Sequence, residues 1–233
     1  MRPAAFAALF ALAGCVTTNI QLTADQQSSV SRRLEGEDRY LKLSFFSTQF
    51  YGDKSKHLLT PVPPDQTRLL DNPDGSPINP GETEAIFPAG TLVRIKKVEF
   101  PSSLVLVERV AITPRTFPWV YLDVAGTPKN AQPYVLVLRP DARSDADFLA
   151  DVERYLTKED PSQSMATFSD AVKDAVKTKR AVVDMPAAAL EMAWGYPEQK
   201  KVTLEGTSRK ETWTWPGGKR VAMLVDGKVS ELP

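Results

Sequence analysis

A change of hydrophobic periodicity at Arg139-Pro140 constrains the fold of this chain more than any other feature. Before it, apolar and polar side chains alternate, as in Leu92–Val98, where Val93 and Ile95 share one side. This period of two is typical of a half-buried strand. After it, apolar residues recur at helical spacing. The sequence therefore predicts an α+β protein in which a β-rich part precedes helices.

The β-rich part is predicted to span residues 38–140 as a small antiparallel barrel or sandwich. Its strands are rich in Val, Leu and aromatic residues and are expected at Tyr40–Phe45, Leu92–Val98, Leu104–Ile112, Trp119–Val124 and Tyr134–Leu138. A proline-rich loop, residues 60–81, interrupts them and contains the turn signal Asn72-Pro73-Asp74-Gly75. A loop of this length is usually either a binding loop or disordered.

Residues 144–233 are predicted to form a second α+β unit. Ser144 is expected to cap a helix that continues past Leu156 and ends before Pro161. Thr167 is expected to cap a second helix, whose last turn contains Lys177, Lys179 and Arg180. The basic residues are interpreted as a solvated helix end, with contact to acidic lipid as the alternative. A short helix from Met185 to Trp194, with Pro186 in its first turn, should stop at Gly195. Three or four antiparallel strands follow, and Asp226-Gly227 is the strongest hairpin signal among them.

Residues 1–14 have the layout of a secretory signal peptide, with Arg2, an apolar run and small residues before Cys15. The run is too short to span a bilayer as a helix. The four residues Leu12, Ala13, Gly14 and Cys15 resemble the lipobox of bacterial lipoproteins. The resemblance implies cleavage before Cys15 and lipid attachment to it, and Val16 in place of Asp implies the periplasmic face of the outer membrane. The alternative is a plain secreted protein.

The following segment, residues 15–37, is rich in Thr, Gln and Ser and is predicted to be a lipidated flexible tether, with a short helix near Thr23–Arg33 as an option.

Composition excludes several classes of function. Without residues 1–14 the chain has 28 Lys and Arg against 29 Asp and Glu, which argues against nucleic-acid binding. One Cys and one His cannot build a Cys/His metal cage, so no metal or cofactor is expected. A Ser–His–Asp triad would need His57, which is interpreted as a solvated loop residue. Catalysis by carboxylates alone stays open, although Asp145, Asp147 and Asp151 fit the acidic start of a helix better.

Two further resemblances concern the fold. The segment Pro88-Ala89-Gly90-Thr91 and the strand after it resemble the entry of small bacterial Src-homology-3-like barrels. The C-terminal order of Met185, Gly195-Tyr196-Pro197, Trp213-Thr214-Trp215 and Asp226-Gly227-Lys228-Val229 resembles the BamE-like family of lipoproteins, also called the small-protein-A or outer-membrane-lipoprotein-A domain. That resemblance implies a non-catalytic accessory domain that binds envelope proteins, among them components of outer-membrane β-barrel assembly, or anionic lipid. Asp184 and Pro186 depart from the family pattern.

These observations lead to a hypothesis of function: an outer-membrane lipoprotein that acts as a non-catalytic scaffold or assembly factor through protein–protein contacts. The alternative is a module that binds peptidoglycan or another ligand with the β-rich part. The candidate interface residues are Trp194, Tyr196, Trp213 and Trp215, with core packing as the other interpretation of the tryptophans.

Overall fold

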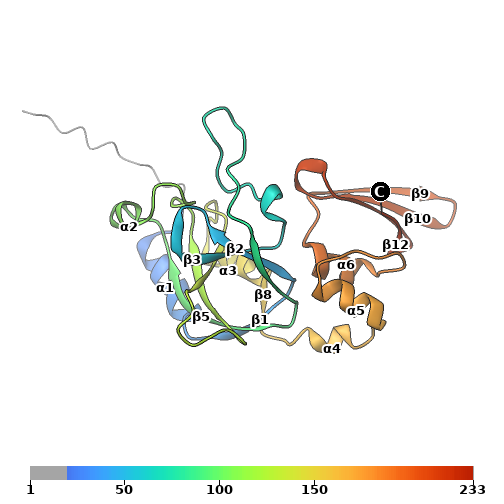
Figure 1. Ribbon diagram of the computed structural model, residues 1–233, viewed down its shortest axis with the longest axis horizontal. Coiled ribbons are helices and arrows are strands. Elements are labelled where there is room, and N and C mark those ends of the chain that lie inside the picture. The colour runs from blue at the N-terminus through green and yellow to red at the C-terminus, as the bar shows by residue number, and fades with distance from the viewer. Residues whose placement is uncertain (1–19, 233) are drawn as a thin grey trace, which may run out of the picture.

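A computed structural model describes residues 20–232 as two units side by side, each with its own sheet (Figure 1). The helices are α1 (Ala24–Leu34), α2 (Ser103–Glu108), α3 (Asp145–Glu153), α4 (Ser162–Met165), α5 (Asp170–Lys177) and α6 (Ala187–Trp194). The larger sheet contains β1 (Asp38–Leu41), β2 (Phe45–Phe50), β3 (Asp53–Thr60), β4 (Thr83–Phe87), β5 (Leu92–Glu99), β6 (Trp119–Val124), β7 (Tyr134–Val137) and β8 (Leu156–Thr157). The smaller sheet contains β9 (Gln199–Glu205), β10 (Ser208–Thr214), β11 (Val221–Val225) and β12 (Lys228–Glu231). The α+β class is confirmed.

The larger sheet has eight strands in the order β4-β2-β3-β7-β6-β5-β1-β8 and is mixed, because β3 and β7 run parallel. The predicted small antiparallel barrel or sandwich is corrected on this point. After β3 the chain leaves the sheet through the proline-rich segment. Strand β7, much later in the sequence, then pairs with the edge of β3 that does not face β2. Pairing so distant in sequence has no local signal. The predicted turn within the loop is confirmed, since the Gly75 amide donates to the Asn72 carbonyl at 2.9 Å.

Helices α1 and α3 pack on the larger sheet, and their apolar faces complete its core. Val30 and Leu34 of α1 and Phe148 and Val152 of α3 are almost fully buried among its strands. Residues 20–37, which the sequence places in a flexible tether, therefore contain a packed helix. Similarly, α3 and β8 join the larger unit, although their sequence follows the predicted boundary at residue 144.

Three local predictions differ from the structure. Leu104–Ile112 is not a strand: Ser102 accepts a hydrogen bond from the Val105 amide and starts α2. The first helix after Ser144 ends at Glu153, and Leu156 lies in β8 instead. The second is capped by Ser169 and not by Thr167. Hydrophobic spacing does not locate a helix end when apolar residues continue into the next element.

In the smaller unit, α5 and α6 cover one face of the sheet β12-β11-β10-β9. Gly195 ends α6 with φ of 81°, and Asp226-Gly227 forms the β11–β12 turn with both φ values positive, as predicted. The hairpin of β9 and β10 extends past the helices at one end of the molecule (Figure 1). Every residue of β9 is consequently exposed.

Candidate binding cleft between the two units

A cleft of about 400 Å³ opens where the larger unit meets the smaller one. One wall is the end of β3 with the proline-rich segment after it, and a second is β7 with the residue that follows α3. Tyr196 and Pro216 of the smaller unit close the third side. The lining is mostly apolar and consists of Leu59, Thr60, Pro61, Val62, Gln66, Thr67, Arg68, Leu69, Leu136, Val137, Arg139, Arg154, Tyr155, Tyr196 and Pro216.

Three arginines supply the charge of this cleft. Arg139 is held by the buried Asp151, whose carboxylate accepts from its backbone amide at 3.1 Å and lies 3.3 Å from its Nε. Within residues 20–232, Arg68 and Arg154 form no ion pair, and both side chains are exposed. A largely apolar cleft with available guanidinium groups suits a ligand that has an apolar body and an anionic group.

Tyr196 connects the cleft to the smaller unit. Its hydroxyl donates to the Arg154 carbonyl at 3.1 Å, and the Arg154 guanidinium lies 5.1 Å from its ring centroid. Burial raises the pKa of Tyr196, and nearby Glu191 raises it further, so the hydroxyl stays protonated and remains a donor at neutral pH. Tyr155 is deeper, and burial raises its pKa as well.

The structure divides the candidate interface residues into two pairs. Trp213 and Trp215 are 3% and 0% exposed and belong to the core of the smaller unit, which agrees with the core-packing interpretation of these two residues. Trp194 and Tyr196 are only partly buried and reach the surface.

Arg220 lies beside Trp194 and Trp215, with its guanidinium 5.1 and 5.8 Å from their rings, and burial lowers the pKa of Arg220 to about 10.

Lys179 is another connection between the units, and the sequence did not reveal it. Its Nζ donates to the carbonyls of Ser44 at 2.5 Å and Pro61 at 3.0 Å in the larger unit, and of Ala193 at 2.7 Å in the smaller one. The residue is 7% exposed, whereas the sequence placed it at a solvated helix end. Burial lowers the pKa of Lys179 well below its ordinary value, and the Arg220 charge adds to this effect.

The remaining candidates lie elsewhere. His57 is not in a loop but on β3, where its Nδ1 is 2.6 Å from a Glu84 carboxylate oxygen and its ring stacks on Tyr134. Asp145 and Asp147 lie in the first turn of α3. In residues 20–232 no group of three or more His, Cys, Asp or Glu side chains is placed to hold a metal ion. The lipobox residues Leu12, Ala13, Gly14 and Cys15 lie outside the described residues.

None of the helices within residues 20–232 combines the length and apolar character that crossing a membrane requires. No protein-family profile matches the chain, and no curated protein or solved structure is significantly similar to it.

Proposed function

We propose that this chain is an outer-membrane lipoprotein, acylated at Cys15 on the periplasmic face, that serves as a non-catalytic scaffold of the cell envelope. The observation that carries the proposal is the sequence Leu12-Ala13-Gly14-Cys15 at the end of a short apolar run. Packed structure begins close behind it, since Ile20 already contacts the core of the larger unit. An acyl anchor on a folded body of two joined units suits a protein that positions partners.

The β9–β10 hairpin is the surface best suited to a protein partner. β9 is an edge strand of the smaller sheet, and an unpaired edge offers backbone groups to an added strand. Val202 and Leu204, the latter 73% exposed, lie on the same face as Trp213 but beyond the covering helices. This combination favours capture of an extended, partly apolar segment of an envelope protein. The order helix, glycine, then antiparallel sheet also supports a BamE-like fold for this unit.

Capture from detergent-solubilised envelope, followed by mass spectrometry, tests the scaffold. We expect envelope proteins to co-purify with the acylated chain and Leu204→Asp to reduce their recovery at least about fivefold, because a buried carboxylate opposes an apolar contact. Met223→Asp is the matched control, since Met223 is exposed on the opposite face of the same sheet. Failure to recover any envelope protein, or equal loss with both variants, would count against this function.

A second function, binding of peptidoglycan or another anionic ligand, is favoured by the cleft and its exposed Arg68 and Arg154 side chains. Stem peptides of peptidoglycan contain carboxylates that guanidinium groups can bind. Sedimentation with purified sacculi tests this alternative. Arg154→Glu should weaken binding at least about tenfold, whereas Arg143→Glu, an exposed arginine outside the cleft lining, should leave it unchanged. Equal binding by both variants would exclude the cleft.

A further inference from the structure

The loop between β5 and β6 presents an unusual apolar surface, which we call the α2 loop (residues 102–113). Its exposed side chains include Leu104 at 69%, Val107 at 84% and Ile112 at 58%, with Val110 beside them. Glu108 is its only acid, and its only base, Arg109, is buried. Exposed large apolar residues gathered on one short segment mark an interaction surface.

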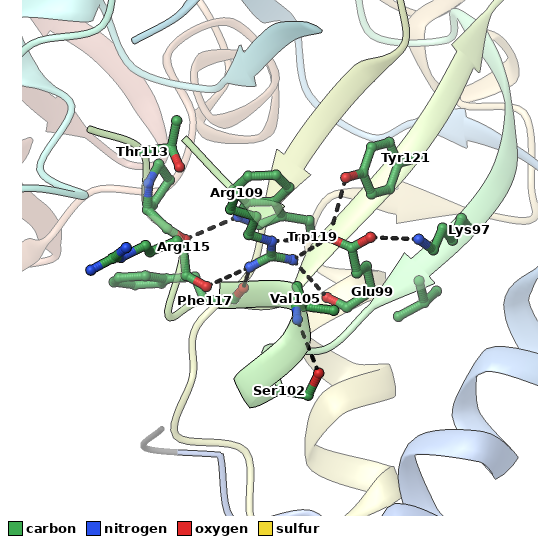
Figure 2. A network of polar contacts seen from close by, with 12 residues as sticks. Lys97, Glu99, Ser102, Val105, Arg109, Thr113, Arg115, Phe117, Trp119 and Tyr121 are labelled. Atoms are coloured by element: carbon green, nitrogen blue, oxygen red, sulfur yellow. Dashed lines mark hydrogen bonds and ion pairs between the residues drawn. The ribbon is translucent and has the colours of Figure 1, made fainter. Parts of the chain in front are cut away.

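The α2 loop is held in place by the buried side chain of Arg109 (Figure 2). The Arg109 guanidinium donates to one Glu99 carboxylate oxygen from Nε at 2.9 Å and from Nη2 at 2.7 Å. Its Nη1 donates to the carbonyls of Arg115 at 2.6 Å and Phe117 at 2.8 Å, and the group lies 3.5 Å from the Trp119 ring centroid. Both ends of the loop are thereby tied to the sheet. The apolar side chains point outward from a fixed backbone.

The position of α1 determines where the proposed lipid anchor on Cys15 lies relative to this loop. The Gly36 amide donates to the Ile95 carbonyl, and Ser31 Oγ donates to the Val98 carbonyl, so α1 runs opposite to β5. The start of α1 therefore points toward the end of β5, from which the α2 loop emerges. In Figure 1, α1 and α2 lie at the same end of the molecule, away from the β9–β10 hairpin.

Chain length sets how far the acyl group can be from this end. Ile20 packs against the core of the larger unit. Five residue steps separate it from Cys15, which span at most about 18 Å when fully extended. A bilayer that holds lipid on Cys15 must therefore lie close to the start of α1, where the α2 loop is also presented.

From this geometry we infer that the α2 loop inserts Leu104 and Val107 into the interfacial region of the membrane that holds Cys15. The inference rests on the proposed lipid anchor. Its occupant is a lipid surface, because the anchor keeps that surface within reach of the loop at high effective concentration. Even weak insertion is then sufficient, as interfacial segments bury apolar side chains only about 5–10 Å deep. The β9–β10 hairpin would face away from the bilayer.

A fluorescence experiment tests this orientation. Cys15 is the only cysteine, so Val107→Cys provides a single free thiol for an environment-sensitive label when Cys15 is acylated. Leu204→Cys is the matched control, since Leu204 is similarly exposed at the far hairpin. The acylated proteins are placed on vesicles of phosphatidylethanolamine and phosphatidylglycerol. We expect vesicles to reduce aqueous quenching of the label at position 107 at least about threefold and to leave position 204 unchanged.

Equal quenching at the two positions in acylated protein would overturn the membrane contact and leave the anchor intact. Mass spectrometry of the same samples tests the anchor separately, and an unmodified thiol at Cys15 would overturn both. Protein that combines Val107→Cys with Cys15→Ala, labelled at position 107 and measured without vesicles, tests whether a second copy of the chain is the occupant. Concentration-dependent shielding of position 107 there would mean that a second copy covers the loop, which contradicts the inference.

Discussion

Lys179 Nζ donates a hydrogen bond of 2.7 Å to the carbonyl of Ala193, and the same amine reaches two carbonyls of the other unit. Lys179 has φ of 55° and follows the end of α5, and its side chain crosses the junction to Ser44 and Pro61. No carboxylate is among its hydrogen-bond partners in the described part of the chain. A single ammonium group therefore satisfies three backbone oxygens that would otherwise lack a hydrogen-bond donor.

Replacing this amine should destabilise the whole protein. Lys179→Met preserves the length of the side chain but leaves three carbonyls without a donor. We expect the free energy of unfolding to fall by about 2–4 kcal/mol, from the cost of unsatisfied buried polar groups. Urea unfolding followed by tryptophan fluorescence measures it. Lys177→Met on the exposed side of α5 should change stability by less than about 0.5 kcal/mol, and an equal effect of the two variants would contradict this role.

The same lysine should make stability depend on alkaline pH. Burial lowers the pKa of Lys179 below the ordinary 10.5 that applies to the unfolded chain. Between these two pKa values the unfolded chain holds a proton that the folded protein has released. The contribution of Lys179 to the free energy of unfolding therefore rises with pH. We expect the wild type to show this rise and Lys179→Met to lack it, when urea midpoints are compared from pH 7 to 10. Identical slopes would show that Lys179 does not titrate there.

Glu99 should contribute to stability in the opposite, acidic range. Burial raises its pKa, but hydrogen bonds and charge from Lys97 and Arg109 outweigh this effect and bring the pKa below the ordinary 4.5. The resulting stabilisation is complete above 4.5 and is lost as pH falls through the lower, folded-state value. Glu99→Gln should flatten the acid limb of the stability curve. Glu108→Gln, an exposed acid of the α2 loop, should leave that limb unchanged.

Gly195 should tolerate no side chain. Its φ of 81° and ψ of −176° lie in a region that only glycine adopts readily, and an added Cβ would be 3.2 Å from Pro61 Cβ in the other unit. We expect Gly195→Ala to cost about 1–3 kcal/mol in urea unfolding. Gly126→Ala has a similar φ of 86° but open space around its Cβ, so it measures the cost of a positive φ without the contact. Equal losses would show that the Pro61 contact is unimportant.

Trp215 should be the most important aromatic residue of the smaller unit. It is fully buried, and its indole nitrogen donates to the Gly195 carbonyl at 3.0 Å. We expect Trp215→Ala to reduce the free energy of unfolding by about 3–5 kcal/mol. Trp194→Ala should cost less because that ring is only half-buried. Chemical denaturation of both variants checks the order, and a larger loss at Trp194 would contradict it.

Local signals made the smaller unit predictable. Gly195 and the Asp226-Gly227 pair specify their own backbone conformations, so the helix end and the hairpin can be placed from sequence. The partners of β3 were not predictable, because the parallel pairing with β7 depends on non-local contacts. Nor could the apolar run of the α2 loop be assigned correctly, since a strand and an outward-facing helix share that composition.

The cleft cannot be predicted from the sequence. The motif Gly195-Tyr196-Pro197 marks Tyr196 as a candidate interface residue, whereas Arg68, Arg139 and Arg154 come from three separate segments and carry no common spacing. Lys179 was missed because lysine is ordinarily a surface residue, and its burial depends on carbonyls supplied by distant parts of the chain.

Because Lys179 donates hydrogen bonds to main-chain atoms of both units, each unit depends on the other for part of its stability. A break in the chain at α4 would expose these carbonyls and the lysine ammonium group to water and remove the hydrogen bonds that join the two sheets. Recombination or truncation that separates the two sheets should therefore lose this shared stabilisation, so the two halves are expected to be inherited together.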